Sequence, residues 1–363
     1  MKKSEKRNFI SEWFGHRIYP KVISTPKSLA EQKAHLCPFL SGAKGESTQC
    51  VKNTKSRGVC TISAMSNGPR QDWVACPYRV LDSKLLDAVA TRLYASPVEL
   101  YAAPRLGDAA CRKEVGRLLA DGDRVVVYFD HKVGGEISLS ATNRSPEMAF
   151  DVTMVELAPQ AKGLRLGKFG ILEIQTMDFH GSYGKSVSKL QNALELHPAN
   201  FPKVLQEHQW WAAEGIEGPN IANVFKRTFY QMMFKFQFGA QQGCAGTALA
   251  ISASVWDSWQ PFLAAPVLSN HTDGTARLLA PGEMAGAQKP PAWIYVFDFH
   301  SAAKSTPSPI RLVTTIGLSA AALGHYALDL APKEASKQLT SESGIYASLR
   351  RRIGEYWPDA EIQ

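Results

Sequence analysis

Three polar side chains stand in two segments whose residue patterns predict β-strands. Glu173 and Gln175 lie two residues apart in the segment 168–177 (KFGILEIQTM), and Asp151 lies in the segment 149–157 (AFDVTMVEL). Because alternate side chains of a strand point to the same face, Glu173 and Gln175 are expected to face together. If the two segments pair antiparallel, Asp151 comes to lie beside Glu173.

Two neighbouring carboxylates repel each other unless a cation lies between them. Their oxygen atoms suit Mg²⁺, which binds one or two carboxylates together with phosphate oxygens. Such an ion polarises a phosphate and activates a water for attack. An isolated Glu-x-Gln pattern is more often the solvated side of an amphipathic strand. The apolar neighbours Ile171, Leu172 and Ile174 nevertheless indicate a central strand, in which a glutamate needs a reason for its burial.

Asp151 followed by Glu173-Ile174-Gln175 resembles the PD-(D/E)XK nuclease motif, in the variant that has Gln in place of the final Lys. Longer segments closely resemble the NotI-like family of rare-cutting type II restriction endonucleases, and similarity covers most of the chain. It is thin between Gly184 and Ala213 and after Asn270. The similar segments are GILEIQTMDFHGSY (170–183), EGPNIANVFKRTFYQMMFKF (217–236), CAGTALAI (244–251), NFISEWFGHRIYP (8–20), CPFL (37–40), SRGVC (56–60) and DWVACPYR (72–79).

The resemblance implies a Mg²⁺-dependent endonuclease that cuts both DNA strands at a GC-rich palindrome centred on GGCC. Asp151 and Glu173 would hold the metal, and Gln175 would occupy the usual Lys position and orient the attacking water or the phosphate. Gln cannot carry a positive charge, so it cannot replace Lys as an electrostatic stabiliser. Glu136 matches an acidic position of the family that adds a ligand through water, although an exposed turn residue explains it equally well. Glu147 lies in the loop before the strand and is not assigned to the site.

Cutting both strands of a palindrome implies a two-fold homodimer. The resemblance also implies a bacterial cytoplasmic protein and a cognate DNA methyltransferase, as a functional rather than a bound partner. One alternative is a DNA-repair or recombination nuclease of the same fold with relaxed specificity. Another is a metal-stabilised DNA-binding module with an inactive site, against which the intact Asp151, Glu173 and Gln175 argue.

Four of the six cysteines lie in the first 80 residues. Cys37, Cys50, Cys60 and Cys76 are separated by 12, 9 and 15 residues, which lacks the paired spacing of a zinc knuckle. Spacing alone favours buried structural thiols. The segment also shows little apolar periodicity, so a metal could supply stability that its own core lacks. The resemblance implies one structural metal per chain on these four thiolates, iron in that family, with zinc compatible.

Candidate DNA contacts follow the Glu173 strand and occupy the polar side of a later helix. The resemblance gives no assignment of base-reading residues, and a solvated helix face explains Lys226 and Arg227 about as well as a phosphate contact does. Arg350 to Arg352 are more typical of a solvated helix end. The candidates are His180, Ser182, Tyr183, Lys185, Lys226 and Arg227.

The composition of the 363 residues is that of a globular protein, with 45% hydrophobic and 20% charged residues. A formal net charge of +8 favours a polyanionic partner without requiring one. The N-terminus lacks the apolar stretch of a secretory signal, so no membrane association is expected. The segment from Leu312 to Leu330 contains His325 and Asp329 and is interpreted as a buried helix.

Residue patterns predict an α/β or α+β fold, namely a restriction-endonuclease-like mixed β-sheet flanked by helices. The predicted domains are a four-cysteine metal-binding region (1–80) and an endonuclease domain (81–363). In the helix at 223–238, an apolar stripe is assigned to the core. Helices are predicted at 82–94, 108–120, 186–196, 223–238 and 343–356, and strands at 124–129, 149–157, 168–177 and 293–299.

Overall fold

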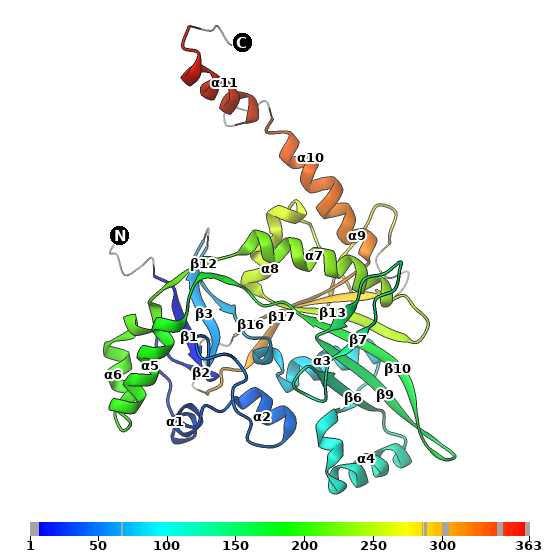
Figure 1. Ribbon diagram of the computed structural model, residues 1–363. Helices are drawn as coiled ribbons and strands as arrows, with labels where there is room; N and C mark the ends of the chain where they lie inside the picture. The colour runs from blue at the N-terminus through cyan, green and yellow to red at the C-terminus, as the bar shows by residue number, and fades with distance from the viewer. Residues whose placement is uncertain are drawn as a thin grey trace.

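The computed structural model describes residues 7–66, 68–284, 286, 289–299, 305–339 and 344–359. Its centre is a mixed β-sheet of nine strands in the order β14-β15-β17-β16-β13-β10-β9-β6-β5 (Figure 1). These strands are β5 (Glu99–Ala102), β6 (Val125–Asp130), β9 (Val152–Gln160), β10 (Gly163–Ile174), β13 (Cys244–Ser252), β14 (Ser269–Asn270), β15 (Ala276–Leu278), β16 (Ala292–Phe299) and β17 (Ile310–Leu318). The predicted class, a large mixed sheet flanked by helices, is confirmed.

Smaller sheets and the helices surround this sheet. The other strands are β1 (Phe9–Trp13), β2 (His16–Arg17), β3 (Val59–Met65), β4 (Arg70–Val74), β7 (Ile137–Leu139), β8 (Met148–Phe150), β11 (Phe179–Gly181) and β12 (Ile216–Pro219). The helices are α1 (Pro26–Lys33), α2 (Pro38–Lys44), α3 (Ser83–Tyr94), α4 (Ala109–Asp121), α5 (Gly184–Leu196), α6 (Phe201–Glu207), α7 (Ile221–Phe238), α8 (Ala253–Trp259), α9 (Ala320–Gly324), α10 (Ala331–Ser336) and α11 (Ile345–Tyr356). A 3₁₀ turn, η1 (Pro77–Val80), follows β4.

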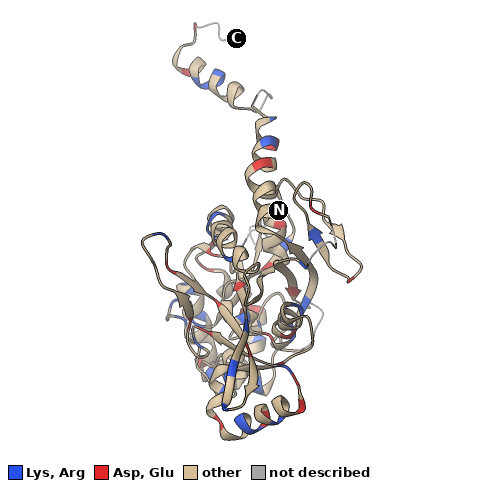
Figure 2. Ribbon diagram, turned by 90° about the vertical axis from the view of Figure 1, so that its right-hand side faces the viewer, with Lys and Arg blue, Asp and Glu red and all other residues tan. Residues whose placement is uncertain are grey.

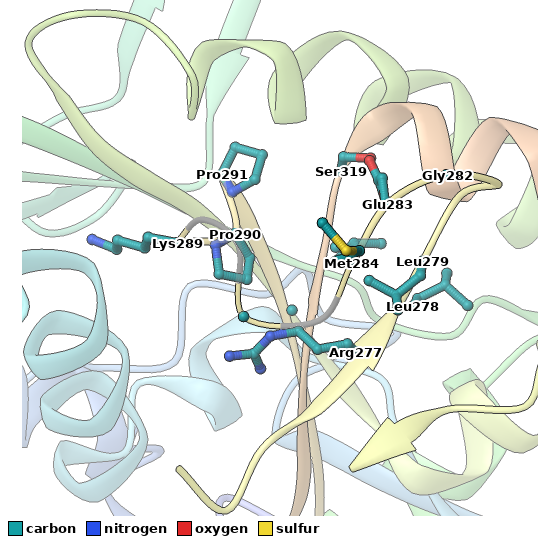
Figure 3. Close-up of a pocket in the computed structure, with 13 residues that line it drawn as sticks. Arg277, Leu278, Leu279, Gly282, Glu283, Met284, Lys289, Pro290, Pro291 and Ser319 are labelled. Carbon is teal, nitrogen blue, oxygen red and sulfur yellow. The ribbon is translucent and has the colours of Figure 1, made fainter. Parts of the chain in front are cut away.

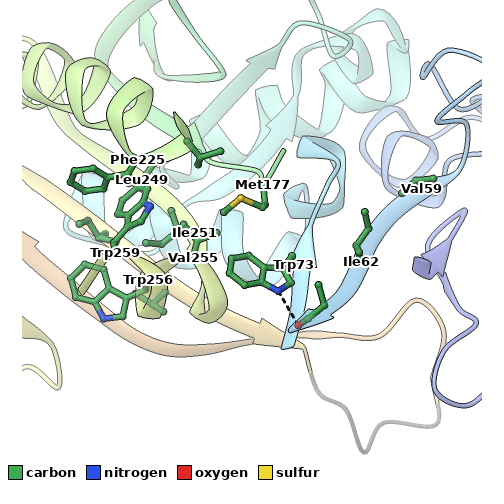
Figure 4. Packing of buried hydrophobic residues seen from close by; sticks show 14 of the residues in the cluster. Val59, Ile62, Trp73, Met177, Phe225, Leu249, Ile251, Val255, Trp256 and Trp259 are labelled. Carbon is green, nitrogen blue, oxygen red and sulfur yellow. Dashed lines mark hydrogen bonds between the residues drawn. The ribbon is translucent and has the colours of Figure 1, made fainter. Parts of the chain in front are cut away.

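Alternate residues of the central strands pack into different cores on the two faces of the sheet. Leu172 and Ile174 of β10 pack in the core that includes α3. Leu249 and Ile251 of β13 pack in the core that includes α7 and α8 (Figure 4). Helix α7 therefore covers the face of the sheet toward which Glu173, between Leu172 and Ile174, is expected to point.

Two of the predicted helices begin at aspartate caps. Asp82 caps α3, because its side chain accepts hydrogen bonds from the backbone N–H groups of Lys84 and Leu85. Asp108 caps α4 in the same way through Ala110. The apolar stripe of α7 is buried or partly buried, which confirms that it belongs to the core.

The first 80 residues form their own four-stranded sheet, in the order β2-β1-β3-β4. Its apolar side chains join the same core as α7, and Trp73 donates a hydrogen bond through Nε1 to the Ala64 carbonyl over 3.3 Å (Figure 4). Arg79 and Glu12 are fully buried and form an ion pair at 2.7 Å. This region therefore shares apolar and ionic contacts with the rest of the chain, which the poor periodicity of its sequence did not indicate.

The interpretation of Leu312 to Leu330 as one buried helix is wrong. Its first part belongs to β17, which pairs antiparallel with β16, and only the residues after Leu318 are helical. The run Val313 to Ile316 is β-branched throughout, and such side chains favour strands. Leu312 and Val313 are 39% and 51% exposed, so this strand is not fully buried either.

Helices α10 and α11 extend away from the sheet (Figure 1), and we call them the C-terminal arm. Basic and acidic positions are interspersed along the body and the arm (Figure 2). Among the described residues, no helix is long and apolar enough to cross a bilayer.

Candidate metal and nucleic-acid site

Asp151 and Glu173 come together because β9 and β10 pair antiparallel. Val152 lies opposite Leu172, so the next pair outward is Asp151 and Glu173. Asp151 interrupts the predicted strand 149–157, which the structure divides into β8 and β9. Its Oδ2 accepts a hydrogen bond from the Ile174 backbone N–H at 2.8 Å. The expected neighbourhood of the two acids is therefore present, and we call them the carboxylate cluster.

Glu173 lies in an environment that opposes its ionisation. The residue is 6% exposed, and burial, with a further contribution from the Asp151 charge, raises its pKa to about 7. Burial also raises the pKa of Asp151, while the hydrogen bond from Ile174 lowers it. Glu173 Oε1 is buried and has no hydrogen-bond partner among the described residues. A buried carboxylate oxygen without a donor is costly, so the cluster is chemically suited to an added cation.

Gln175 lies one residue beyond the end of β10 and points toward the same helix as Glu173. Its Oε1 accepts a hydrogen bond from the Thr228 hydroxyl of α7, and its Nε2 donates to the Thr176 carbonyl. The expectation that Glu173 and Gln175 share a face agrees with these contacts, since both side chains reach α7. The amide of Gln175 is engaged at both ends, which fixes its position.

Two buried residues of this neighbourhood were missed by the sequence reasoning. Lys235 of α7 is 4% exposed, and its Nζ lies 2.5 Å from Glu173 Oε2. Asp130, at the end of β6, is 5% exposed, and its pKa is raised by burial and by the Asp151 charge. A signal for Lys235 was available, because it follows Thr228 and Met232 at helical spacing on the inward stripe of α7.

Glu136 is exposed and lies in the loop before β7. Its charge raises the pKa of both Asp130 and Asp151, so its carboxylate lies within electrostatic range of the carboxylate cluster. The structure thus leaves both interpretations of Glu136 in place.

The candidate DNA contacts gather around β11 and the first turns of α7. His180 and Ser182 are exposed at β11, Lys185 is exposed on α5, and Tyr183 is half-buried. Arg227 forms an ion pair with Asp178, just before β11, at 3.0 Å. The backbone N–H of Asn220 donates to the Asp178 carbonyl at 2.8 Å, which joins the start of α7 to the same place.

Cys37, Cys50, Cys60 and Cys76 influence one another electrostatically, and we call them the thiol cluster. Burial raises the pKa of Cys37 to about 12 and raises those of Cys60 and Cys76. Backbone N–H groups nevertheless point at the sulfurs. Gly15 donates to Cys60 Sγ at 3.2 Å, and Gly58 donates to Cys50 Sγ at 3.4 Å. Such donors stabilise a thiolate, so the donor chemistry of this cluster suits a metal.

Across the described ranges, no three His, Cys, Asp or Glu side chains form a group that could hold a metal as they stand. The hollows of the surface also lie elsewhere. A cavity of about 340 Å³ opens between the residues around Gly282 and the segment Lys289–Pro291, with Arg277 beneath it (Figure 3). Neither Asp151 nor Glu173 lines it.

Comparison with known proteins adds no assignment to this geometry. No protein-family model matches the chain, and no curated protein matches it as a relative.

Proposed function

We propose that this protein is a Mg²⁺-dependent type II restriction endonuclease that makes sequence-specific double-strand cuts. The observation that carries the proposal is the carboxylate cluster. Asp151 and Glu173 face each other across two paired strands, and Glu173 retains a buried oxygen without a partner. Two acids are placed in this way at a cost, because burial opposes their charge. A divalent ion offsets that cost.

Asp151 and Glu173 are the residues that would hold Mg²⁺. When bound, the ion polarises the scissile phosphate and lowers the pKa of the attacking water. The backbone N–H of Ile174 orients Asp151, and Gln175 braces β10 against α7 through Thr228. These hydrogen bonds keep both carboxylates in place before the substrate arrives.

The exposed polar residues around β11 are the proposed DNA-facing surface. His180, Ser182 and Arg227 are close to the end of the strand that carries Glu173, and the chain has a net charge of +8. Positive charge near the cut site favours a polyanion through counterion release. The proposed target is a GC-rich palindrome centred on GGCC, where arginine pairing with guanine O6 and N7 is the natural direct readout. We place the protein in the bacterial cytoplasm, with its DNA.

We further propose that two copies act together through the C-terminal arm, because a palindrome presents two equivalent scissile bonds. Helix α11 has no buried residue, and its apolar side chains recur at helical spacing. Ile345, Leu349 and Ile353 are 52%, 47% and 44% exposed, and Trp357 beyond the helix is 65% exposed. Such an uncovered stripe suits the same stripe of a second copy. Ile353→Asp is expected to convert the dimer to a monomer in sedimentation analysis.

For the thiol cluster we propose one structural metal per chain, iron or zinc. Support comes from the convergence of the four sulfurs and from the backbone N–H groups that point at them. Since thiolates rather than thiols bind metal, binding would release protons from thiols that burial keeps neutral. Four ligands complete a tetrahedral set, which leaves no open position for chemistry.

The proposed activity is tested by incubating the protein with a GC-rich plasmid and Mg²⁺, beside a Glu173→Gln variant that keeps the side-chain shape. Discrete fragments from the wild type and none from the variant are expected. A smear of fragments would instead indicate a nuclease of relaxed specificity. Intact plasmid with wild-type protein would rule out the endonuclease proposal.

A further inference from the structure

Lys235 is a buried cation directed at the carboxylate cluster. It is 4% exposed, and its Nζ lies 2.5 Å from Glu173 Oε2. The ammonium group also lies 5.5 Å from the centre of the Phe150 ring, and Phe150 directly precedes Asp151. Its charge lowers the pKa of Asp151 as well as that of Glu173. One ammonium therefore faces both acids.

The residue that occupies the motif position after Glu173 cannot supply this charge. Gln175 is neutral, and both ends of its amide are bound within the protein, to Thr228 and to the Thr176 carbonyl. Among the ion pairs of the described residues, Lys235 is the cation that contacts the carboxylate cluster. Phosphodiester cleavage places negative charge on the phosphate oxygens, and a fixed cation in a dry site stabilises that charge strongly.

The fold explains why a lysine of α7 can reach this place. Thr228, Met232 and Lys235 follow the helical repeat and lie on the stripe of α7 that packs on the sheet. Thr228 contacts Gln175 and Lys235 contacts Glu173, so the helix is docked at two points along the end of β10. A buried lysine is unfavourable in an apolar core, and this one is tolerated because it faces carboxylates.

We propose that Lys235 is the catalytic cation of the nuclease site, supplied by α7 in place of a lysine at position 175. In the DNA-free protein its ammonium neutralises Glu173, and in the reaction it contacts the scissile phosphate and stabilises the charge that develops there. This assignment rests on the proposed endonuclease function. It differs from a structural role, in which Lys235 would serve only to hold Glu173 and α7 together.

The test compares Lys235→Met with a control, Lys113→Met, which removes an exposed lysine of α4. We expect Lys235→Met to slow single-turnover cleavage by at least about 100-fold, and the control to leave the rate unchanged. Ca²⁺ binding to the DNA-free protein at mildly alkaline pH gives a readout without cleavage. We expect its affinity to rise about tenfold in Lys235→Met, because a nearby ammonium no longer repels the ion.

A charge swap separates the two roles. Adding Gln175→Lys to Lys235→Met returns an ammonium from the motif position, and we expect it to recover at least about tenfold of the lost rate. If Lys235→Met does not fold, Lys235→Arg takes its place. That variant keeps the ion pair with Glu173 but changes the shape of the cation, so unchanged thermal stability with a rate below about one tenth of wild type supports the proposal.

Three results would overturn the assignment. The first is an active wild type whose rate Lys235→Met, or Lys235→Arg where that replaces it, leaves within about threefold. The second is a loss of Ca²⁺ affinity in Lys235→Met equal to that in Glu173→Gln, which would mark a purely structural lysine. The third is a double variant no faster than Lys235→Met alone. A wild type that cuts no DNA would instead contradict the proposed function, which keeps the two failures distinct.

Discussion

The carboxylate cluster has a cation of the protein's own within hydrogen-bonding distance, whereas no ion pair of the described residues includes a sulfur of the thiol cluster. Lys235 faces Glu173 and Asp151, while the nearest named cation of the thiols, Lys52, donates its hydrogen bonds to the carbonyls of Val59 and Ala75. A site with its own cation can remain charged without a metal. A site with neutral thiols needs a metal before it becomes charged, which fits a permanently bound ion.

The two clusters are also close enough to influence a common residue. Burial raises the pKa of Tyr78, and the charges of Asp130, Cys76, Cys37 and Asp151 raise it further. Tyr78 belongs to η1, the turn that follows Cys76. A change in the thiol cluster therefore has a short structural route to the carboxylates.

The largest expected effect comes from the carboxylate cluster. Asp151→Asn keeps the shape of the side chain but removes one of the two charges, so we expect DNA cleavage to fall by at least about 1,000-fold. Single-turnover rates on a GC-rich plasmid measure it. Asp121→Asn, at the exposed end of α4, is the matched control and should cut normally. Equal losses in both variants would contradict the assignment.

A second prediction asks how much the thiol region depends on ionic contacts rather than on metal. Arg79→Met leaves Glu12 buried without its partner, so we expect the free energy of unfolding to fall by at least about 3 kcal/mol. Urea denaturation of the apo-protein measures it. Adding Glu12→Leu should restore part of the loss, because no buried charge then remains. A loss below about 1 kcal/mol would show that this ion pair does not hold the region in place.

A third prediction addresses the thiol cluster directly. Cys60→Ser should abolish the bound metal and lower the free energy of unfolding by about 2 kcal/mol. Cys244→Ser is the matched control, because Cys244 is similarly buried and lies outside the cluster. Metal analysis and thermal denaturation of both variants give the answer. If wild type holds well under one metal per chain, the four cysteines are ordinary core thiols.

The smallest expected effect concerns the brace between β10 and α7. Thr228→Val removes the hydroxyl that donates to Gln175, which leaves a buried amide oxygen without its partner. We expect a loss of about 1 kcal/mol in unfolding free energy and a cleavage rate within about tenfold of wild type. A rate loss as large as that of Asp151→Asn would assign Gln175 a direct part in the reaction instead of a positioning one.

Much of the carboxylate cluster could be predicted because it depends on local order. The alternation around Glu173 and the pairing of two adjacent strands place Asp151 beside it, as the structure does. Lys235 could not be predicted with the same ease, since it comes from a helix 62 residues further along the chain. Only the docking of α7 on the sheet brings its ammonium to Glu173.

The errors of sequence interpretation have a common physical origin in tertiary contacts. Strand β1 is buried along its whole length, so its sequence lacks the alternation that marks a half-exposed strand. The segment around Val313 was misread for a different reason, because its Ala- and Gly-rich continuation suggested a helix. Pairing with β16, a tertiary contact, decides its conformation.

The most direct test of the account is to sequence the ends of the DNA fragments that the protein makes from a GC-rich plasmid in Mg²⁺. We predict one palindromic sequence centred on GGCC at every end, with the same overhang throughout, and no fragments with Asp151→Asn. Ends without a common sequence, or the same fragments from Asp151→Asn, would contradict specific cleavage at the carboxylate cluster.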